Sequence, residues 1–390
     1  MSYLLFGTLI VLIVLGIGAA RRISLYSPLM ISALVWQFVF ACGLLVGNHF
    51  YPVTDRAFVL WLVWFLVSST AYFFLSDQPP EAGAAECRRL PLDYSLALVA
   101  LILWLAYQIR AVGSAGPAQF LSNLRLSAND NAGLTSLRFV DRFYPWVFAL
   151  FIFEHVNARA GNRRLRFLLW FLMMQFTMAT MGKLTALTPI LAWAVIKGVR
   201  GGLPLRKLAV LVPAIFCLLI GLHLARALVG EKTEIGTFLG LYVYSPLVAL
   251  GYMATPHDLP FGAHTFRFVY ALWHALAGGA QPVEVVQGYV AVPLPTNVYT
   301  VIQPFALDFG VVGVALGAAI YGVFFSLLFR LARLNGQLSL ILYAGFSMAL
   351  VGQFIGEFMF TMFSGQLQFV IAAVLVVSQS RRVPAQAKAV

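Results

Sequence analysis

The chain has 390 residues, of which 61% are apolar and 10% are charged, and its net charge is +12. An ordinary soluble domain has about 25% charged residues, so this composition excludes a soluble enzyme and a disordered chain. Long unbroken apolar runs exclude a transmembrane β-barrel, whose strands are short and alternate. We therefore expect an all-α, polytopic helical membrane protein, because a helix satisfies its own backbone hydrogen bonds in lipid.

Apolar segments predict about 11 transmembrane helices in a single polytopic membrane domain, residues 1–390. In chain order they cover about 3–20, 28–47, 57–75, 94–112, 143–157, 166–181, 184–197, 208–229, 308–331, 337–356 and 358–379. Two connections on one side are long: about 113–142, with helical character, and about 230–307, before a late helix. The larger loop is rich in aromatic residues and prolines, so we expect folded structure on or in the membrane face.

The positive charge follows the predicted topology. Of the 26 Lys and Arg residues, 17 lie in alternate connections: Arg21, Arg22, Arg88, Arg89, Arg159, Arg163, Arg164, Arg166, Lys197, Arg200, Arg206, Lys207, Arg330, Arg333, Arg381, Arg382 and Lys388. The positive-inside rule makes that side cytoplasmic. With eleven spans, the N-terminus is then outside and the C-terminus is inside. Most of the charge is explained in this way, which argues against a nucleic-acid partner.

The segment 166–197 joins two basic clusters, so it must cross outward and return. Each arm has about 15 residues, or roughly 23 Å, which is shorter than a hydrocarbon core of about 30 Å. The apex, 181–185, should therefore lie below the outer surface. Lys183 at this apex either snorkels to the surface or contacts an anion in an outward-facing cavity.

Nine cations lie on the outer side, where the positive-inside rule does not explain them. Guanidinium groups can pair with two phosphate oxygens at once. We therefore select as candidate substrate-binding residues Arg125, Arg138, Arg142, Lys183, Arg226, Lys232 and Arg267. Arg138 and Arg142 are four residues apart and share one helix face. The simpler alternative is a solvated loop helix with local ion pairs.

The stretch 262–277 predicts a helix with one polar face. At about 100° per residue, Arg267 and His274 project within roughly 20° of each other, and His264 lies about 60° away. Histidine can act as a general base near neutral pH, so His264 and His274 are candidate catalytic residues. The alternative is an interfacial helix whose polar face meets water or lipid headgroups.

The segment Pro293–Thr300 precedes the late helix. Its prolines favour extended chain, and Thr296 and Asn297 can offer hydrogen bonds to a substrate. Asp308 is a third candidate base at the floor of an outward cavity, or it is simply the N-cap of the following helix. The sequence contains no carboxylate cluster or His-Glu-x-x-His spacing, so we expect neither a metal nor a cofactor.

The chain resembles the Wzy-type O-antigen polymerases, which join oligosaccharide repeat units during the synthesis of bacterial surface polysaccharides. The resemblance rests on Pro295-Thr-Asn-Val-Tyr-Thr300, Asp308-Phe-Gly-Val-Val-Gly313, Tyr242–Leu250 and Met181-Gly-Lys183. The family also carries an Arg-x10-Gly pattern in its outer loops. Arg267 and Gly278 match this spacing, whereas no arginine in the medium loop does.

This resemblance implies a GT-C-like architecture and a multi-pass protein of the bacterial inner membrane whose site faces the periplasm. A sugar hydroxyl of an incoming repeat unit would attack the anomeric carbon of the growing chain, and undecaprenyl pyrophosphate would leave. Preorganised cations would stabilise the leaving group without a metal. The expected partners are the undecaprenyl-pyrophosphate-linked oligosaccharide, membrane lipid and a polysaccharide chain-length regulator.

Three alternatives stay open. An O-antigen ligase would use the same donor but a different acceptor. A transporter or flippase would move the lipid-linked oligosaccharide without breaking a bond, although such proteins tend to show repeated halves, and the sequence contains no internal repeat. A non-catalytic assembly subunit would keep its function after single substitutions at the outer face.

Overall fold

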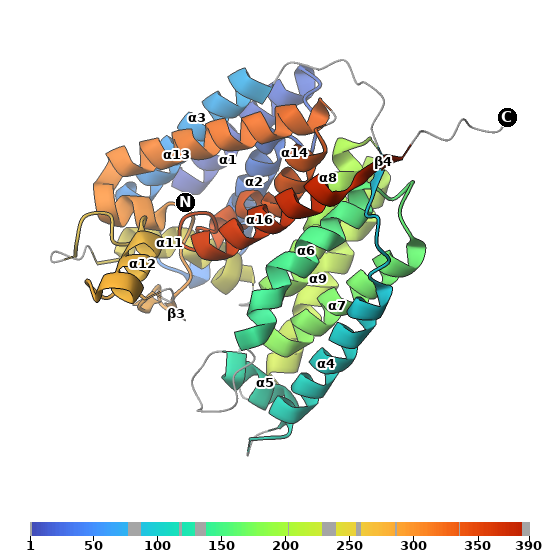
Figure 1. The fold of residues 1–390 in the computed structure, drawn as a ribbon. Coiled ribbons are helices and arrows are strands. Elements are labelled where there is room, and N and C mark those ends of the chain that lie inside the picture. Colours follow the sequence, from blue (N-terminus) through green and yellow to red (C-terminus); the bar gives the residue numbers. More distant parts are fainter. Residues whose placement is uncertain are drawn as a thin grey trace. The chain divides into compact units, whose positions relative to one another are not determined.

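The computed structural model describes the chain over residues 2–76, 87–116, 119–128, 138–201, 203–227, 239–254, 259–284, 287–334 and 336–383. These residues are mostly helical, and every apolar segment that the sequence predicts as a span contains helix (Figure 1). The chain divides into two compact units. Unit 1 is Met1–Pro79, Glu234–Arg330 and Met348–Ser364, and unit 2 is Pro80–Thr233, Leu331–Ser347 and Gly365–Val390.

Several helices are long and apolar enough to cross a membrane. Within the described ranges these are α1 (Ser2–Ala20), α2 (Pro28–Val46, continued to His49), α3 (Asp55–Ser76), α4 (Ser95–Gly113) and α13 (Gln303–Arg333). The helix α14 (Gln337–Gly345) and the helical segment Ser347–Phe354 are bent by 43° at their junction and form a further span if they are counted together. Helix length and apolarity thus support a membrane-embedded protein.

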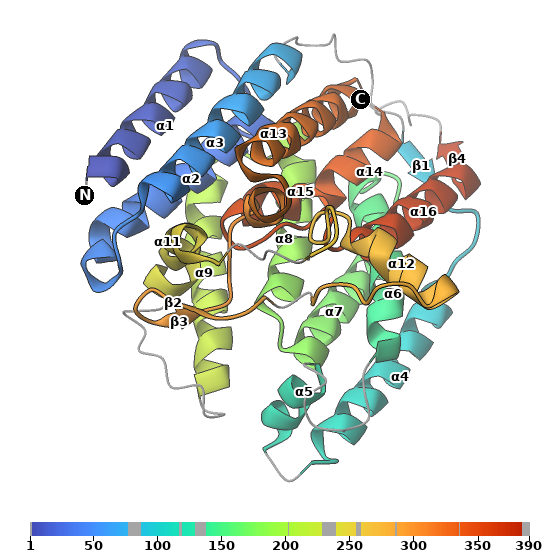
Figure 2. The same cartoon turned by 90° about the vertical axis from the view of Figure 1, so that its left-hand side faces the viewer.

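Unit 1 combines α1, α2, α3 and most of α13 with short elements. These are η1 (Gly47–His49), the π-helix η2 (Gly240–Tyr244), α11 (Ser245–Tyr252), α12 (Arg267–Ala277), β2 (Val290–Ala291), β3 (Pro295–Thr296), α15 (Ser347–Val351) and η3 (Gly352–Phe354). The helix α2 begins where Ser27 accepts a hydrogen bond from the Met30 amide. It packs against α1, α3, η2 and η3, and Figure 2 shows α1, α2 and α3 side by side.

The described parts of the large loop predicted over 230–307 are folded, as expected. Its segment Tyr242–Leu250 forms the end of η2 and most of α11, where the residues from Val243 to Leu250 are buried. The helix α11 packs against α3 and the short hairpin of β2 and β3. One of the motifs that carries the family resemblance is therefore part of the core of unit 1.

The core of unit 1 surrounds the side chain of Gln353, which is fully buried. Its Oε1 accepts hydrogen bonds from Nε1 of Trp36 and Nε1 of Trp64, both at 3.1 Å, and from the Ser32 hydroxyl at 3.3 Å. One amide oxygen therefore holds η3 to α2 and α3. The Trp64 ring also stacks on Phe305 of α13, with a centroid distance of 5.7 Å.

The helix α13 is interrupted at Gly310, which has φ +60° and ψ −146°. Glycine adopts this conformation readily because it has no Cβ to clash with the backbone. The break separates a short helical segment, beginning at Gln303, from the long apolar part of the helix. Gly313 allows a close approach one turn later, since a Cβ there would lie 2.5 Å from the Phe305 carbonyl oxygen.

Unit 2 is arranged around α7, which packs against α4, α5, α6 and α8 (Figure 1). Its elements are β1 (Cys87–Arg89), α4, α5 (Phe120–Ala128), α6 (Arg138–Val156), α7 (Arg163–Thr180), α8 (Lys183–Val199), α9 (Leu205–Ala227), α14, α16 (Phe363–Gln379) and β4 (Arg381–Val383). The predicted out-and-back pair is the hairpin of α7 and α8. These helices have 18 and 17 residues, so each is about 26 Å long.

The basic connections of unit 2 gather at one end. The strand β1 pairs antiparallel with β4, which sets Arg88 opposite Arg382. Asn157, buried just after α6, accepts a hydrogen bond from the Arg88 amide at 2.8 Å and another from Gln337. Arg200 donates to the last carbonyl of α6. Segments that the charge pattern assigns to one side of the membrane therefore lie together.

Replacing Gly310 with Ala should lower the free energy of unfolding by about 1–3 kcal/mol, because a side chain is strained in this backbone conformation. The matched control is Gly16→Ala in α1, where nothing lies within 4 Å of the new Cβ and where Ala should be neutral or slightly stabilising. Thermal unfolding of both variants in one detergent measures the difference. A Gly310 variant as stable as the wild type would contradict the break.

Candidate functional site

The predicted site residues are divided between the two units. Unit 1 holds the three candidate bases and three of the candidate binding residues: His264, His274, Asp308, Arg267, Thr296 and Asn297. Unit 2 holds Arg125, Arg138, Arg142, Lys183 and Arg226. Lys232 lies outside the described residues. We take unit 1 as the candidate site because two segments that are distant in sequence meet there at Asp308.

The carboxylate of Asp308 binds a turn that lies more than forty residues earlier. Its Oδ1 accepts the His264 amide at 3.2 Å, and its Oδ2 accepts the Thr265 amide at 2.6 Å. Hydrogen bonds to an ionised acceptor are roughly twice as strong as neutral ones. Asp308 does lie just before the break at Gly310, after which the long apolar part of α13 begins. The N-cap interpretation of Asp308 is nevertheless wrong, because both of its carboxylate oxygens accept amides of another segment.

The two residues held by Asp308 are buried and carry polar atoms without partners. His264 is 7% exposed and Thr265 is 4% exposed. The His264 Nε2 and the Thr265 Oγ1 make no hydrogen bond within the described part of the chain. A buried polar atom without a partner costs roughly 1–3 kcal/mol, so such a pair is suited to receive a polar group of a ligand.

Burial also affects the protonation of His264. It lowers the pKa of the imidazole because the charged form loses water, and the nearby Asp308 carboxylate partly opposes this shift. His264 is therefore neutral at pH 7 and has a ring nitrogen that can accept a proton. A neutral imidazole whose ring nitrogen can accept a proton has the properties of a general base.

The two residues after Asp308 complete the junction. The Phe309 ring lies 4.9 Å from the Phe261 ring and 6.2 Å from the Phe266 ring, measured between centroids. Gly310 then breaks the helix, as described above. In the motif Asp308-Phe309-Gly310, the acid binds the 264–265 amides, the aromatic ring packs on the flanking phenylalanines, and the glycine redirects the chain.

The predicted helix over 262–277 is shorter than expected. The helix α12 begins at Arg267, and His264 lies in the preceding turns, where Gly262 has φ +69°. The prediction that His264 shares a helix face with Arg267 and His274 is therefore wrong. The reason lies in the backbone, because Gly262 at φ +69° is outside the helical region. The Asp308 carboxylate then accepts the amides of residues 264 and 265 in the turns that follow.

The Arg-x10-Gly spacing corresponds to one complete helix. Arg267 is the first residue of α12, and Gly278 is its C-cap in the left-handed region at φ +63°. The Arg267 Nε donates to the Val283 carbonyl at 2.7 Å, which orients the guanidinium. Partial burial lowers the pKa of Arg267, but a guanidinium stays charged in proteins.

His274 lies on the last turn of α12 and is exposed. Its Nδ1 is 2.8 Å from the Gly279 carbonyl oxygen, so it takes part in closing the helix end. The helix α12 has no buried residues, and its apolar side chains Val269, Leu272, Trp273 and Leu276 are all exposed. An apolar helix face of this kind fits the interfacial helix that the sequence analysis kept open.

Thr296 and Asn297 lie in the hairpin before α13. Thr296 is in β3 opposite Val290, and its side chain is buried. Its Oγ1 accepts the Val298 amide at 3.2 Å, so this hydroxyl stabilises the local turn. Asn297 is half-buried. The prolines of this segment do favour extended chain, since Pro295 is itself a strand residue.

The cations of unit 2 are held by helices that the sequence predicted. Arg125 is half-buried on α5, and its Nε makes no hydrogen bond within the described residues. Arg138 and Arg142 both lie on α6, as their spacing predicted. Lys183 is the first residue of α8, directly after the Gly182 N-cap. The side chains of Arg138 and Arg226 lie outside the described set.

A buried carboxylate in unit 1 was not predicted as a site residue. Glu357 accepts the amides of Met359, Phe360 and Thr361 at 2.7–2.8 Å and a hydrogen bond from the Tyr321 hydroxyl. In the sequence, the only indication that Glu357 could be important was its position as an acid beside an apolar segment. Among the described residues, no three His, Cys, Asp or Glu side chains gather as metal ligands.

Comparison with known proteins finds no relative: no family model, no curated protein and no solved structure matches the chain.

The Asp308→Asn variant should loosen the turn at 262–266, because an amide side chain replaces one of the two acceptor oxygens with a donor. Hydrogen exchange of these amides should accelerate about tenfold or more, since a hydrogen bond to a charged group contributes roughly 1.5–3 kcal/mol. The control is Asp93→Asn, an exposed acid of unit 2 that accepts the Ser95 amide at 2.9 Å. Unchanged exchange at 262–266 would show that Asp308 does not hold this turn.

Proposed function

We propose that the protein is a Wzy-type polymerase that joins undecaprenyl-pyrophosphate-linked oligosaccharide repeat units at the periplasmic face of the bacterial inner membrane. In this proposal the chain spans the membrane about eleven times in a GT-C-like architecture, with the N-terminus outside and the C-terminus inside. Asp308, His264 and Arg267 form the central part of the site. The other candidate cations contribute to binding the pyrophosphates of donor and acceptor.

The observation that carries the proposal is the turn at 264–267. The imidazole of His264 is buried and neutral, and its Nε2 has no partner within the described residues. The guanidinium of Arg267 follows three residues later in the chain. Glycosyl transfer from a pyrophosphate needs a proton acceptor for the attacking hydroxyl and a cation for the leaving group. Two of the motifs that suggested the family, Asp308–Gly313 and Arg267 with Gly278, are built into this turn and its neighbours.

The proposed reaction makes one bond and breaks one bond. The oxygen of an acceptor sugar hydroxyl attacks the anomeric carbon of the lipid-linked chain, and the bond from that carbon to the pyrophosphate oxygen breaks. The hydroxyl proton goes to His264 Nε2. The electron pair leaves with undecaprenyl pyrophosphate, whose developing charge Arg267 stabilises.

Arg267 is suited to this role because its orientation is fixed. The bond from Nε to the Val283 carbonyl uses one of five N–H groups. The remaining N–H groups form a fork that matches phosphate oxygens. We infer that these cations make a metal unnecessary, in line with the expectation from the sequence.

The test is an assay with purified protein and a synthetic undecaprenyl-pyrophosphate-linked repeat unit, read by mass spectrometry as a ladder of products. We expect a ladder that survives EDTA. Arg267→Ala should slow its formation roughly 100- to 1,000-fold, the usual cost of removing one preorganised donor. Arg206→Ala, which removes an exposed arginine of α9 in unit 2, should leave the rate unchanged.

The same assay distinguishes the alternatives. A single transfer to a lipid core, without a ladder, would support the ligase. Uptake of the intact lipid-linked unit into proteoliposomes, without any transfer, would support the flippase and overturn the polymerase. Turnover that is indifferent to every outer-face substitution would support an assembly subunit.

The pH dependence of turnover should report on His264. Burial lowers its pKa below the usual 6.5, so the imidazole stays neutral as the pH falls to about 6.5 and becomes protonated only at lower pH. The polymerisation rate should therefore hold down to about that pH and then fall. His264→Gln should lower the rate by roughly 100-fold or more and abolish the fall in rate at low pH, which is the acid limb of the pH profile. His274→Gln should retain this acid limb. An acid limb that survives His264→Gln would rule out His264 as the base.

A further inference from the structure

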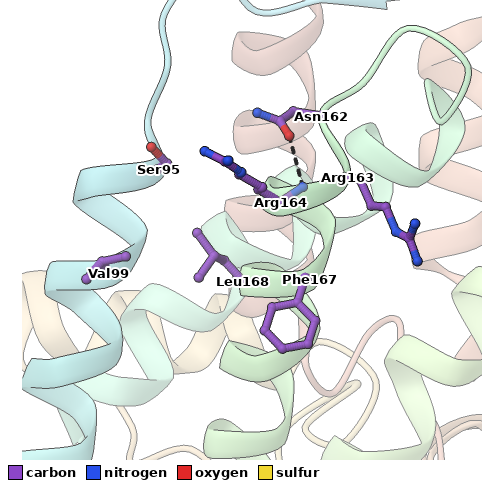
Figure 3. Close-up of a pocket in the computed structure, with 7 residues that line it drawn as sticks. All are labelled: Ser95, Val99, Asn162, Arg163, Arg164, Phe167 and Leu168. Atoms are coloured by element: carbon purple, nitrogen blue, oxygen red, sulfur yellow. Dashed lines mark hydrogen bonds between the residues drawn. The ribbon is translucent and has the colours of Figure 1, made fainter.

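A groove lies between α4 and α7 in unit 2, at the end where the basic connections gather. Its volume is about 760 Å³. Ser95 and Val99 line it from α4, and Arg164, Phe167 and Leu168 line it from α7 (Figure 3). Both helices belong to the same compact unit and pack on each other. The groove is separate from the proposed catalytic turn, which belongs to unit 1.

Two arginines line the groove, Arg163 and Arg164, and the Arg164 guanidinium is the one that extends towards α4. Figure 3 shows Arg164 extending from α7 towards Ser95, whereas Arg163 extends to the other side of the helix. The Asn162 side chain already accepts the Arg164 amide at 2.9 Å, so the helix end itself is capped. The exposed guanidinium is therefore the group that can meet a ligand anion.

One acid lies nearby and does not cancel this positive charge. Asp93 has a lowered pKa, first because its carboxylate accepts hydrogen bonds from the Ser95 amide and the Ser95 hydroxyl, and then because Arg89 and Arg164 are close. Arg163 adds a further positive charge at the same helix end. Two cations, Arg89 and Arg164, thus lie near one carboxylate, and this excess of positive charge favours the binding of a further anion.

The groove below the guanidinium is apolar. Phe167 is 70% exposed and lies one helical turn from Arg164, and Val99 and Leu168 continue this surface. One turn corresponds to about 5.4 Å along the helix axis. A charged rim over an apolar floor matches an amphiphile with an anionic head and a hydrocarbon tail.

We propose that this groove binds one anionic phospholipid of the surrounding membrane. The phosphodiester lies against the Arg164 guanidinium, and one acyl chain follows Val99, Phe167 and Leu168. A soluble phosphate would use only the rim of the groove, and a zwitterionic lipid would bring its own cation to an already positive rim. An anionic phospholipid uses both parts and complements the charge.

The test is native mass spectrometry of the full chain in detergent, titrated with phosphatidylglycerol or with phosphatidylcholine of the same acyl chains. We expect tighter binding of phosphatidylglycerol. Arg164→Gln should weaken that binding about fivefold, the usual effect of one cation near a membrane surface. The matched control, Arg206→Gln, removes an exposed arginine at the start of α9, outside the groove, and should leave the binding unchanged.

Two further measurements keep the proposal falsifiable. Val99→Trp should fill the apolar part and weaken the binding of both lipids without a change of charge, while unchanged thermal unfolding shows that each variant is folded. Glycerol phosphate should not compete with the lipid; competition would assign the rim to a soluble phosphate and overturn the proposal. Equal weakening by Arg164→Gln and Arg206→Gln would also overturn it, because it would mean nonspecific attraction to a basic surface.

Discussion

The candidate site depends on the pair of hydrogen bonds that the Asp308 carboxylate accepts from the amides of residues 264 and 265. These bonds tie α13 to the turn that buries His264 and Thr265, directly before α12 begins at Arg267. Gly310, two residues after Asp308, breaks α13 and changes the direction of the chain. The packing of Phe261 and Phe266 on Phe309 adds a second contact between this turn and α13.

The rest of unit 1 follows the same physical constraint, since polar groups in an apolar environment must find partners inside the protein. The side-chain oxygen of Gln353 accepts hydrogen bonds from two tryptophans and a serine. The carboxylate of Glu357 accepts hydrogen bonds from three consecutive backbone amides. Other buried polar atoms of unit 1 also lack hydrogen-bond partners within the described residues, among them Nε2 of Gln353 and Nε1 of Trp61. The atoms of His264 and Thr265 differ from these because they lie together on a turn just before Arg267, where a ligand can supply partners for both.

The sequence predicts the local structure well and the site only in part. Each predicted span contains helix within the described residues, and the length between two basic clusters identified the α7–α8 hairpin, because both depend on local pattern. The 43° bend between α14 and Ser347–Phe354 and the break at Gly310 were not predicted. The spacing of Arg267 and Gly278 marks a helix and its cap for the same reason. The position of His264 depends on a tertiary contact with Asp308 and on the positive φ of Gly262, neither of which helical periodicity contains. The partners of Gln353 lie far away in the sequence, and those of Glu357 depend on the geometry of a turn. The sequence alone therefore did not predict the roles of these two residues.

The most direct test of the central claim is to count the leaving group. Sealed proteoliposomes would be supplied with the lipid-linked repeat unit, and free undecaprenyl pyrophosphate would be quantified together with the number of new glycosidic bonds. Polymerisation at the site described above predicts one undecaprenyl pyrophosphate released for each bond formed. Transfer of the intact lipid-linked unit across the membrane, with no undecaprenyl pyrophosphate released, would contradict it.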